Sequence, residues 1–307
     1  MFRLVLLFGL PFVLFVGRET AGRVEEAPAP TTPRDVTAET LRDPRALAAL
    51  EKTGEILFAD DFESSESVKN YFEIRGIDDG TAQLVFGGGL AHSGRGAIRL
   101  TAPAVEVGPS GSGATGWLGA SGYERVYFRR YIRFQDDYDQ GNHHHVGGML
   151  AGVAGDNKWA EMGRSGVRPT GADRFTCAFE PWRDWGRNAS PGVMIFYTYW
   201  VDMKRDADGT WWGNILAPVE ERRKVLPRGK WVCLEQMIRV NTIGKADGEL
   251  AGWIDGELYL HMSGFRWRTS ENVRVKRFDL SIYVHEARRT NTVWYDDVVL
   301  STGYIGP

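Results

Sequence analysis

Hydrophobic and polar residues alternate with a period of two through much of this chain, as in β-strands with one buried face. The longest alternating stretch begins at Trp231. One side of this stretch carries Val232, Leu234, Ile238 and Val240. The other side carries Trp231, Cys233, Glu235, Met237 and Arg239. Asp-Gly pairs follow at 247–248 and 255–256, and Asp-Gly between β-prone runs indicates a tight turn. Three antiparallel strands are therefore predicted over 229–264, and they need a second layer to cover their apolar face.

The same alternation recurs at 125–134, 195–201 and 277–286. In the first of these, Arg130 interrupts the apolar face formed by Val126, Phe128, Ile132 and Phe134. The polar sides of these strands and of the 231–240 stretch supply Tyr127, Arg129, Tyr131, Arg133, Tyr197, Tyr199, Glu235, Arg239, Tyr283 and His285. If the strands share a sheet, its exposed face offers flat aromatic surfaces and bidentate partners for carboxylates. That face predicts a site for a sugar chain carrying carboxylates; the alternative is a solvated face whose arginines lie flat on tyrosines.

Composition supports a β-rich fold. Eleven Trp, 11 Tyr and 37 Gly among 307 residues, with little helical periodicity, favour an all-β sandwich with long loops. The glycine-rich stretch 108–116 is predicted to be one such loop, because it offers few side chains for a core. A net charge of -3 argues against a general nucleic-acid binder, so the expected partner is a polysaccharide, bound by a monomer.

The N-terminal segment, residues 1–22, has the features of an export signal. Arg3 precedes an apolar run, Leu4 to Val16, that is short for a membrane span, and small residues follow near Ala21. An uncleaved anchor is the alternative. We expect a secreted or periplasmic protein with no membrane contact beyond this signal.

Residues 23–54 are predicted to be a disordered tether with one short helix. The stretch 23–39 is rich in Pro, Ala, Thr and charge. Asp43-Pro44 then resembles an N-cap and first helical position, which predicts a helix from Pro44 to Thr53. The folded β-domain is expected to span 55–307.

Several motifs resemble a known family. ILFADDFE at 56, YFRRYIRF at 127, GGMLAG at 147, FYTYW at 196 and YDDVVLS at 295 follow the order seen in concanavalin A-like β-jelly rolls. The chain is most similar to the alginate and glucuronan lyase branch, polysaccharide lyases of the 14 and 20 type. The resemblance implies a two-sheet antiparallel jelly roll that binds an acidic, uronate-containing polysaccharide and cleaves it by β-elimination.

The resemblance also implies site residues. Tyr197 and Tyr199 match the Tyr-x-Tyr strand of these lyases, whereas Met149 stands where their loop carries lysine. A lyase needs a group that holds the carboxylate, a base and an acid. We expect His145 and Tyr199 as base and acid, with Tyr197 beside them.

The uronate carboxylate is then expected on Arg133 or Arg129, with His143 contacting substrate. Two other functions fit the same scaffold. One is lectin-like glycan binding without catalysis, and the other is glycoside hydrolysis by carboxylates of separate strands, such as Glu235 with Asp279.

Cofactor and cysteine predictions leave alternatives open. No cofactor is expected for the reaction, but related jelly rolls hold a structural calcium, for which Asp61, Glu63 and Asp296 offer hard oxygens; the alternative is turn-stabilising carboxylates. Cys177 and Cys233 are predicted either to bridge the two sheets or to be buried free thiols.

Overall fold

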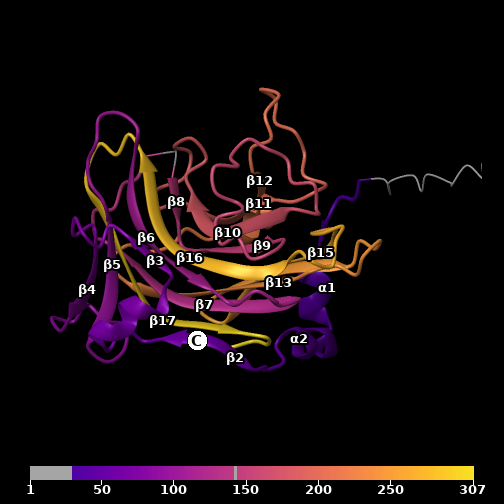
Figure 1. The fold of residues 1–307 in the computed structure, drawn as a ribbon, viewed down its shortest axis with the longest axis horizontal. Coiled ribbons are helices and arrows are strands. Elements are labelled where there is room, and N and C mark those ends of the chain that lie inside the picture. The colour runs from indigo at the N-terminus through magenta and orange to yellow at the C-terminus, as the bar shows by residue number, and fades with distance from the viewer. Residues whose placement is uncertain (1–29, 142–143) are drawn as a thin grey trace, which may run out of the picture.

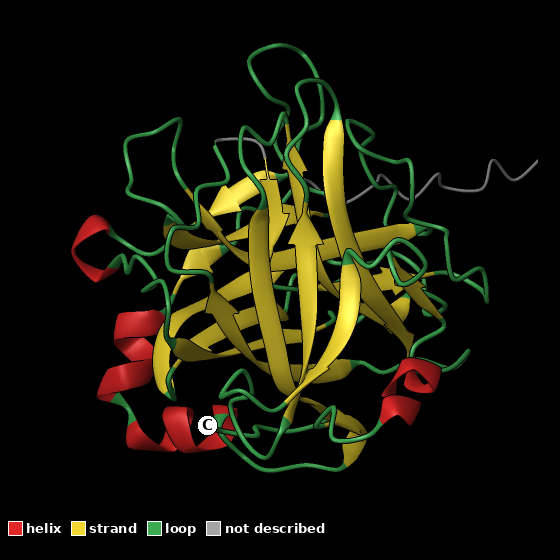
Figure 2. Ribbon diagram, turned by 90° about the vertical axis from the view of Figure 1, so that its left-hand side faces the viewer, coloured by secondary structure: helices red, strands yellow, loops and turns green. Residues whose placement is uncertain are grey.

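Two antiparallel β-sheets pack face to face in the computed structural model, which describes residues 30–141 and 144–307 (Figure 1). The predicted export signal and His143 lie outside the described residues. Figure 2 shows strands filling the centre of the molecule and helices at its periphery. The prediction of an all-β, two-sheet jelly roll is confirmed.

The first sheet, here called the β7 sheet, has the order β1-β15-β14-β13-β7-β17-β5-β4, and β2 also pairs with β17. Its strands are β1 (Arg34–Asp35), β2 (Ile56–Asp60), β4 (Ala82–Phe86), β5 (Gly96–Ala102), β7 (Arg125–Phe134), β13 (Trp231–Arg239), β14 (Gly248–Ile254), β15 (Glu257–Phe265) and β17 (Asn291–Ser301).

The second sheet, here called the β16 sheet, has the order β12-β11-β10-β9-β16-β6-β3, and β8 also pairs with β16. Its strands are β3 (Glu73–Arg75), β6 (Pro109–Trp117), β8 (His144–Val146), β9 (Met149–Val153), β10 (Arg174–Trp182), β11 (Val193–Tyr199), β12 (Asn214–Leu216) and β16 (Arg274–His285).

The core lies between the sheets and is rich in aromatic side chains. Phe128 of β7 meets Phe278 of β16 with ring centroids 5.6 Å apart, and both are fully buried. Phe179 and Phe196 stack at 4.4 Å on neighbouring strands of the β16 sheet. Burying one such side chain contributes about 1.5–3 kcal/mol, so these contacts hold the two layers together.

The predicted strands over 229–264 are present as β13, β14 and β15. Asp255 and Gly256 have φ of 50° and 79° between β14 and β15, as a type I′ turn requires. The apolar side of β13 faces the core, which Leu234 and Ile238 enter fully buried. The alternating pattern was therefore sufficient to place this part of the chain.

Residues 30–39, part of the predicted tether, form a strand and the start of a helix, and the helix predicted from Pro44 is present. β1 pairs with the edge strand β15, and the Thr40 hydroxyl lies 2.8 Å from Nδ1 of His261. Two short helices follow, α1 (Thr37–Arg42) and α2 (Pro44–Leu50), and Asp43 caps the second by accepting from the Arg45 N–H. The contacts of this segment with the edge of the β7 sheet hold it in place, although its composition alone favours disorder.

The predicted glycine-rich loop is also wrong, because residues 109–117 form strand β6 beside β16. The core needs glycine there. A Cβ at Gly116 would collide with the ring of Phe278, and a Cβ at Gly111 would collide with the Ile282 carbonyl. These glycines let large neighbours approach the strand backbone.

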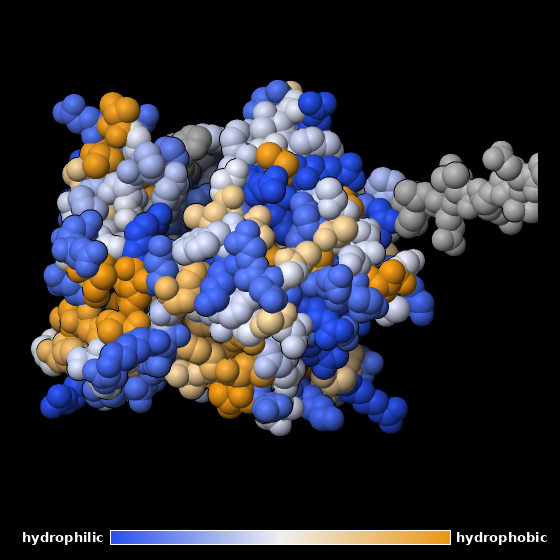
Figure 3. Space-filling view, in the orientation of Figure 1, coloured by the Kyte–Doolittle hydropathy of each residue, from blue (hydrophilic) through white to orange (hydrophobic). Residues whose placement is uncertain are grey.

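Short 3₁₀ turns, η1 (Ser65–Asn70) and η2 (Glu220–Arg222), complete the elements. Among the helices of the described residues, none combines the length and the apolar character needed to span a bilayer. The face seen in Figure 3 is mostly hydrophilic, with smaller apolar patches.

Candidate active site

The residues predicted to line one sugar-binding face are divided between two faces. β7 and β13 belong to one sheet, while β8, β11 and β16 belong to the other. Each strand turns its apolar side toward the shared core, so the polar sides of the two sheets point in opposite directions. His145, Tyr197, Tyr199, Tyr283 and His285 are brought together on the outer face of the β16 sheet.

His145 is the centre of this group. Its Nδ1 atom lies 2.9 Å from Oε1 and 3.1 Å from Oε2 of Glu180 on β10. The side chain of Glu180 is only 5% exposed, whereas that of His145 is 45% exposed. The carboxylate therefore fixes the ring from below, and Nε2 of His145 is available to a ligand.

The charge of Glu180 tunes His145. Packing around the ring lowers the pKa of His145, but the charge and hydrogen bond of Glu180 outweigh this effect, so that pKa lies above its usual value. The pair resembles the histidine–carboxylate arrangement that orients a general base and stabilises its protonated form.

Two tyrosines of β11 lie next to this pair. The Tyr197 ring is centred 5.1 Å from the His145 ring, and its hydroxyl lies 3.4 Å from the hydroxyl of Tyr199. The Gly213 N–H donates to the Tyr197 hydroxyl at 3.0 Å. Burial raises the pKa of Tyr197 well above its usual value, so the phenol stays protonated. Tyr197 can thus donate a proton or a hydrogen bond toward the exposed face.

Strand β16 continues the face on the other side of His145. Tyr283 is paired in register with His145, and its hydroxyl lies 2.9 Å from Nε2 of His285. Asp279 is mostly buried on the same face. Burial raises the pKa of Asp279, and the neighbouring Glu180 charge adds to this against the opposing effect of Arg277.

On β6, next to β16, glycines leave the outer face of the sheet without side chains. Gly111 and Gly113 of β6 are paired with Tyr283 and Ser281, and they place no side chain there. Arg75 of β3 is paired with Gly113 and is exposed. An arginine therefore lies on this face two strands from Ser281.

Loops border the outer face of the β16 sheet at the end near Tyr199 and Arg277. The guanidinium of Arg277 forms a buried ion pair with Glu161 and packs 5.4 Å from the ring of Trp159, in the loop between β9 and β10. Figure 1 shows the loop between β11 and β12 rising above the same side of the sheet. The face is thus bounded at the Tyr199 end.

Other predicted residues are held on the opposite side, under α2 and the C-terminal residues. The Tyr127 hydroxyl donates to the Leu50 carbonyl at 2.5 Å, and Arg129 donates to the carbonyls of Asp297 and Gly306. Glu235 accepts from the N–H groups of Ile305 and Gly306. The prediction that these three contact substrate beside His145 is wrong, because they pack the N- and C-terminal segments against the β7 sheet.

Tyr131, Arg133 and Arg239 are also on the outer face of the β7 sheet. Tyr131 stacks on His92 at 3.5 Å, and Arg133 lies 5.6 Å from the ring of Trp294. The catalytic role predicted for Arg133 is therefore wrong. The hydrolytic pair Glu235 and Asp279 is wrong for the same reason, because the two carboxylates face away from each other across the sandwich.

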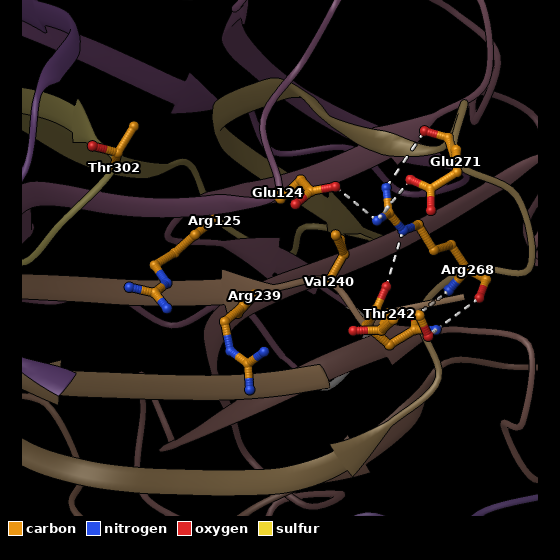
Figure 4. A pocket seen from close by; sticks show the side chains of 9 residues that line it. Glu124, Arg125, Arg239, Val240, Thr242, Arg268, Glu271 and Thr302 are labelled. Carbon is orange, nitrogen blue, oxygen red and sulfur yellow. Dashed lines mark hydrogen bonds and ion pairs between the residues drawn. The ribbon is translucent and has the colours of Figure 1, made fainter. Parts of the chain in front are cut away.

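A pocket of the described residues lies away from Tyr197 and Tyr199, with no residue of β11 in its lining. It has a volume of about 500 Å³ and is lined by Glu124, Arg125, Arg239, Val240, Asn241, Thr242, Arg268, Glu271 and Thr302 (Figure 4). Arg239 is paired with Glu249 at 2.9 Å, and Arg268 with Glu124 at 2.9 Å. Since these charges pair within the protein, Arg239 has a structural role there rather than the predicted one in the sugar face.

The carboxylates predicted for calcium accept backbone hydrogen bonds. Glu63 accepts from Arg95 and Gly96 at 2.6 and 2.7 Å, and Asp61 accepts from the Glu63 N–H at 3.2 Å. Asp296 is fully buried and accepts from His92 and Ser93. No group of three His, Cys, Asp or Glu in the described residues is placed to hold a metal ion, so calcium gains no support here. The alternative of carboxylates that stabilise turns fits these contacts.

The cysteines are free. Cys177 is buried in the core beside the Thr198 hydroxyl, at 3.3 Å, whereas Cys233 is paired with Tyr131 on the outer side of the β7 sheet. The β7 sheet therefore separates the two thiols, which rules out the predicted bridge in favour of two buried free thiols.

Glu180 was not predicted as a site residue. It lies in the 176–182 run TCAFEPW, where alternation places it on the same side as Thr176 and Ala178. A single acid in a mostly apolar run was the available signal. Its partner His145 is distant in sequence, and the two meet only because β8 lies against β10 in the folded sheet.

Comparisons with solved structures agree with the fold described above. Alginate lyase vAL-1 from Chlorella virus superposes with a TM-score of 0.59 at 12% identity, covering 80% of this chain and 99% of that one. The marine PL-14 alginate lyase from Aplysia kurodai gives 0.57 at 14% identity, covering 83% and 98%. Endo-β-1,4-glucuronan lyase from the fungus Trichoderma reesei gives 0.50 at 12% identity, covering 80% and 95%. At these identities the likeness establishes the jelly-roll fold.

The polysaccharide lyase 14 family model matches residues 114–284, more than half of the chain. The chain belongs to this family. A search of curated protein sequences found no match.

Proposed function

We propose that this protein binds an acidic, uronate-containing polysaccharide across the outer face of the β16 sheet and cleaves it by β-elimination. The observation that carries the proposal is the His145–Glu180 pair, 2.9 Å apart, beside Tyr197 and Tyr199 on one exposed face. Membership of the polysaccharide lyase 14 family supports the same chemistry.

The geometry suggests a role for each group. Nε2 of His145 takes the proton from the carbon next to the uronate carboxylate, while Glu180 stabilises the imidazolium that forms. The electron pair of that C–H bond forms a double bond to the next ring carbon, whose bond to the leaving oxygen breaks. Tyr197, which stays protonated, donates to that oxygen, and Tyr199 positions the Tyr197 hydroxyl at 3.4 Å.

This assignment revises the roles predicted from the sequence. Tyr199 was expected to be the acid, but the contact of the Tyr197 ring with the His145 ring favours Tyr197. Met149 lies on the same face, paired with Asp279, and offers no charge. Arg75 is proposed to attract the carboxylates of the chain instead, since it lies beside the glycines of β6.

We also propose that the protein is exported, because its polymeric substrate lies outside the cell that makes it. The expected signal at 1–22 provides the route. The reaction assigns its proton transfers to side chains and invokes no cofactor.

Absorbance of the unsaturated uronic product, followed with alginate and polyglucuronate, tests the proposal. Wild-type protein should generate the product, and His145→Ala combined with Tyr197→Phe should not. Unchanged cleavage by the double variant would remove the assignment. Binding of polymer without product would indicate a lectin-like protein, and reducing ends without that absorbance would indicate hydrolysis.

A further inference from the structure

A row of aromatic and basic side chains crosses the outer face of the β7 sheet, opposite the candidate active site. Trp231, Arg133, Trp294, Arg99 and Gln83 are paired in register on β13, β7, β17, β5 and β4. We call these five residues the Trp–Arg row. All except Gln83 are half-buried, and Gln83 is exposed.

The positive charges of this row are not neutralised by the protein. Arg133 packs 5.6 Å from the Trp294 ring, and Arg99 donates to the Gln83 side chain. Neither arginine forms an ion pair with a described residue. Two carboxylates on the same strand as Trp294 are engaged elsewhere: Asp296 accepts backbone N–H groups, and Asp297 lies 2.6 Å from Nδ1 of His92. Two guanidinium groups are thus available for anions.

The spacing of the row suits an extended sugar chain. Neighbouring strands are about 4.8 Å apart, so the backbone positions that carry the two indoles, like those that carry the two guanidiniums, are roughly 9.6 Å apart. This is close to the length of two sugar units in an extended polysaccharide. Indole faces pack against sugar C–H groups, and arginine pairs with carboxylates between them. An acidic polysaccharide fits both features, whereas a neutral chain would leave the arginines unused.

We propose that the Trp–Arg row is a second, non-catalytic binding site for an acidic polysaccharide chain. The existence of this site follows from the row itself, while a uronate polymer as its ligand rests on the proposed function. A site on the opposite face of the sandwich holds the protein on a long polymer while the β16 sheet engages another segment. Such two-site attachment increases retention on long chains more than on short ones.

Retention of the protein by long-chain alginate and polyglucuronate, measured by affinity electrophoresis, tests this site. The test variant, Arg99→Gln with Arg133→Gln, removes two charges. The control, Arg42→Gln with Arg45→Gln, removes the same charge from the exposed surface of α1 and α2. The test variant should bind long chains roughly 3- to 30-fold more weakly than the control, and added salt should reduce this difference. Equal retention of the two variants would overturn the proposal.

The same measurement in a His145→Ala background separates this inference from the proposed lyase activity. Retention that persists in His145→Ala and is lost on adding the two Arg→Gln changes supports the row, even if wild-type protein yields no unsaturated product. Loss of retention in His145→Ala alone would place polymer binding on the β16 sheet and overturn the inference. Trp294→Ala, with its fold checked by thermal melting, should reproduce the loss, and normal retention by that folded variant would likewise count against the row.

Discussion

Nδ1 of His145 lies 2.9 Å from Oε1 of Glu180, and the two side chains differ sharply in exposure. The buried acid holds a half-exposed imidazole at the surface of the β16 sheet. Because the Glu180 carboxylate engages Nδ1 of His145, Nε2 is left to contact a substrate bound at that surface. The pair makes this face chemically distinct from the outer face of the β7 sheet, where Glu235 bonds only to backbone N–H groups.

The first prediction concerns pH. The base form of His145 exists above its raised pKa, so kcat/KM should fall as the pH decreases through that pKa. Glu180→Gln removes the charge that raises this pKa, and the acidic limb of the profile should move to lower pH with a lower maximum. Activity that instead declines as His145 loses its proton would show that the imidazolium acts as a cation for the carboxylate.

The second prediction separates the tyrosines. Tyr197→Phe should reduce kcat by about 10²- to 10⁴-fold with little change in KM, as expected for loss of a general acid. Tyr199→Phe should have a smaller effect, because the Tyr197 hydroxyl keeps its bond from the Gly213 N–H. Steady-state kinetics on one polymer decides between them, and a larger loss in Tyr199→Phe would exchange the two roles.

The third prediction concerns Arg75. Arg75→Gln should raise KM for the polymer several-fold and change kcat little, because an exposed arginine two strands away contributes to attraction rather than to the reaction. The Arg45→Gln variant provides the control for loss of one exposed charge. A fall in kcat alone would contradict this assignment.

The fourth prediction concerns stability and Glu235. Burial raises the pKa of Glu235 to about 7, against hydrogen bonds that lower it. The folded state therefore holds a proton that the unfolded state releases near its usual pKa of 4.5, and stability should decrease as pH rises from about 4.5 to 7. The loss over this window should reach about 3 kcal/mol at most. Denaturant unfolding at several pH values measures it, and the slope should flatten in Glu235→Gln.

The fifth prediction concerns Arg130, which is fully buried between the sheets. It donates to the carbonyls of Gly147 at 2.5 Å and Phe179 at 2.9 Å, next to the corner that leads from β8 to β9. Arg130→Met leaves these carbonyls without a donor and should lower the free energy of unfolding by about 2 kcal/mol. The same substitution at exposed Arg45 should change it by less than about 0.5 kcal/mol. Equal stability of the two variants would show that the corner is held by other contacts.

Period-two alternation identified β7, β11, β13 and β16 and the inward and outward side chains of each. The resemblance of FYTYW and GGMLAG to known lyases pointed to Tyr197 and to the segment around His145. Arg130 could be recognised as an exception to the apolar face, but its partners could not. The same local reasoning misjudged β6, because the collision that requires glycine at position 116 comes from Phe278, far along the chain.

The sequence by itself determined that this protein is a two-layer β-fold, which side of each strand enters the core, and which family it resembles. Only the tertiary structure decided that Arg129, Arg133 and Glu235 face away from Tyr197, and that Glu180 lies beneath His145. The reason is that alternation orients each side chain relative to its own sheet, and both sheets of a sandwich have a polar outer side. Which strands share a sheet depends on pairing between distant segments, and that pairing fixes which polar groups meet.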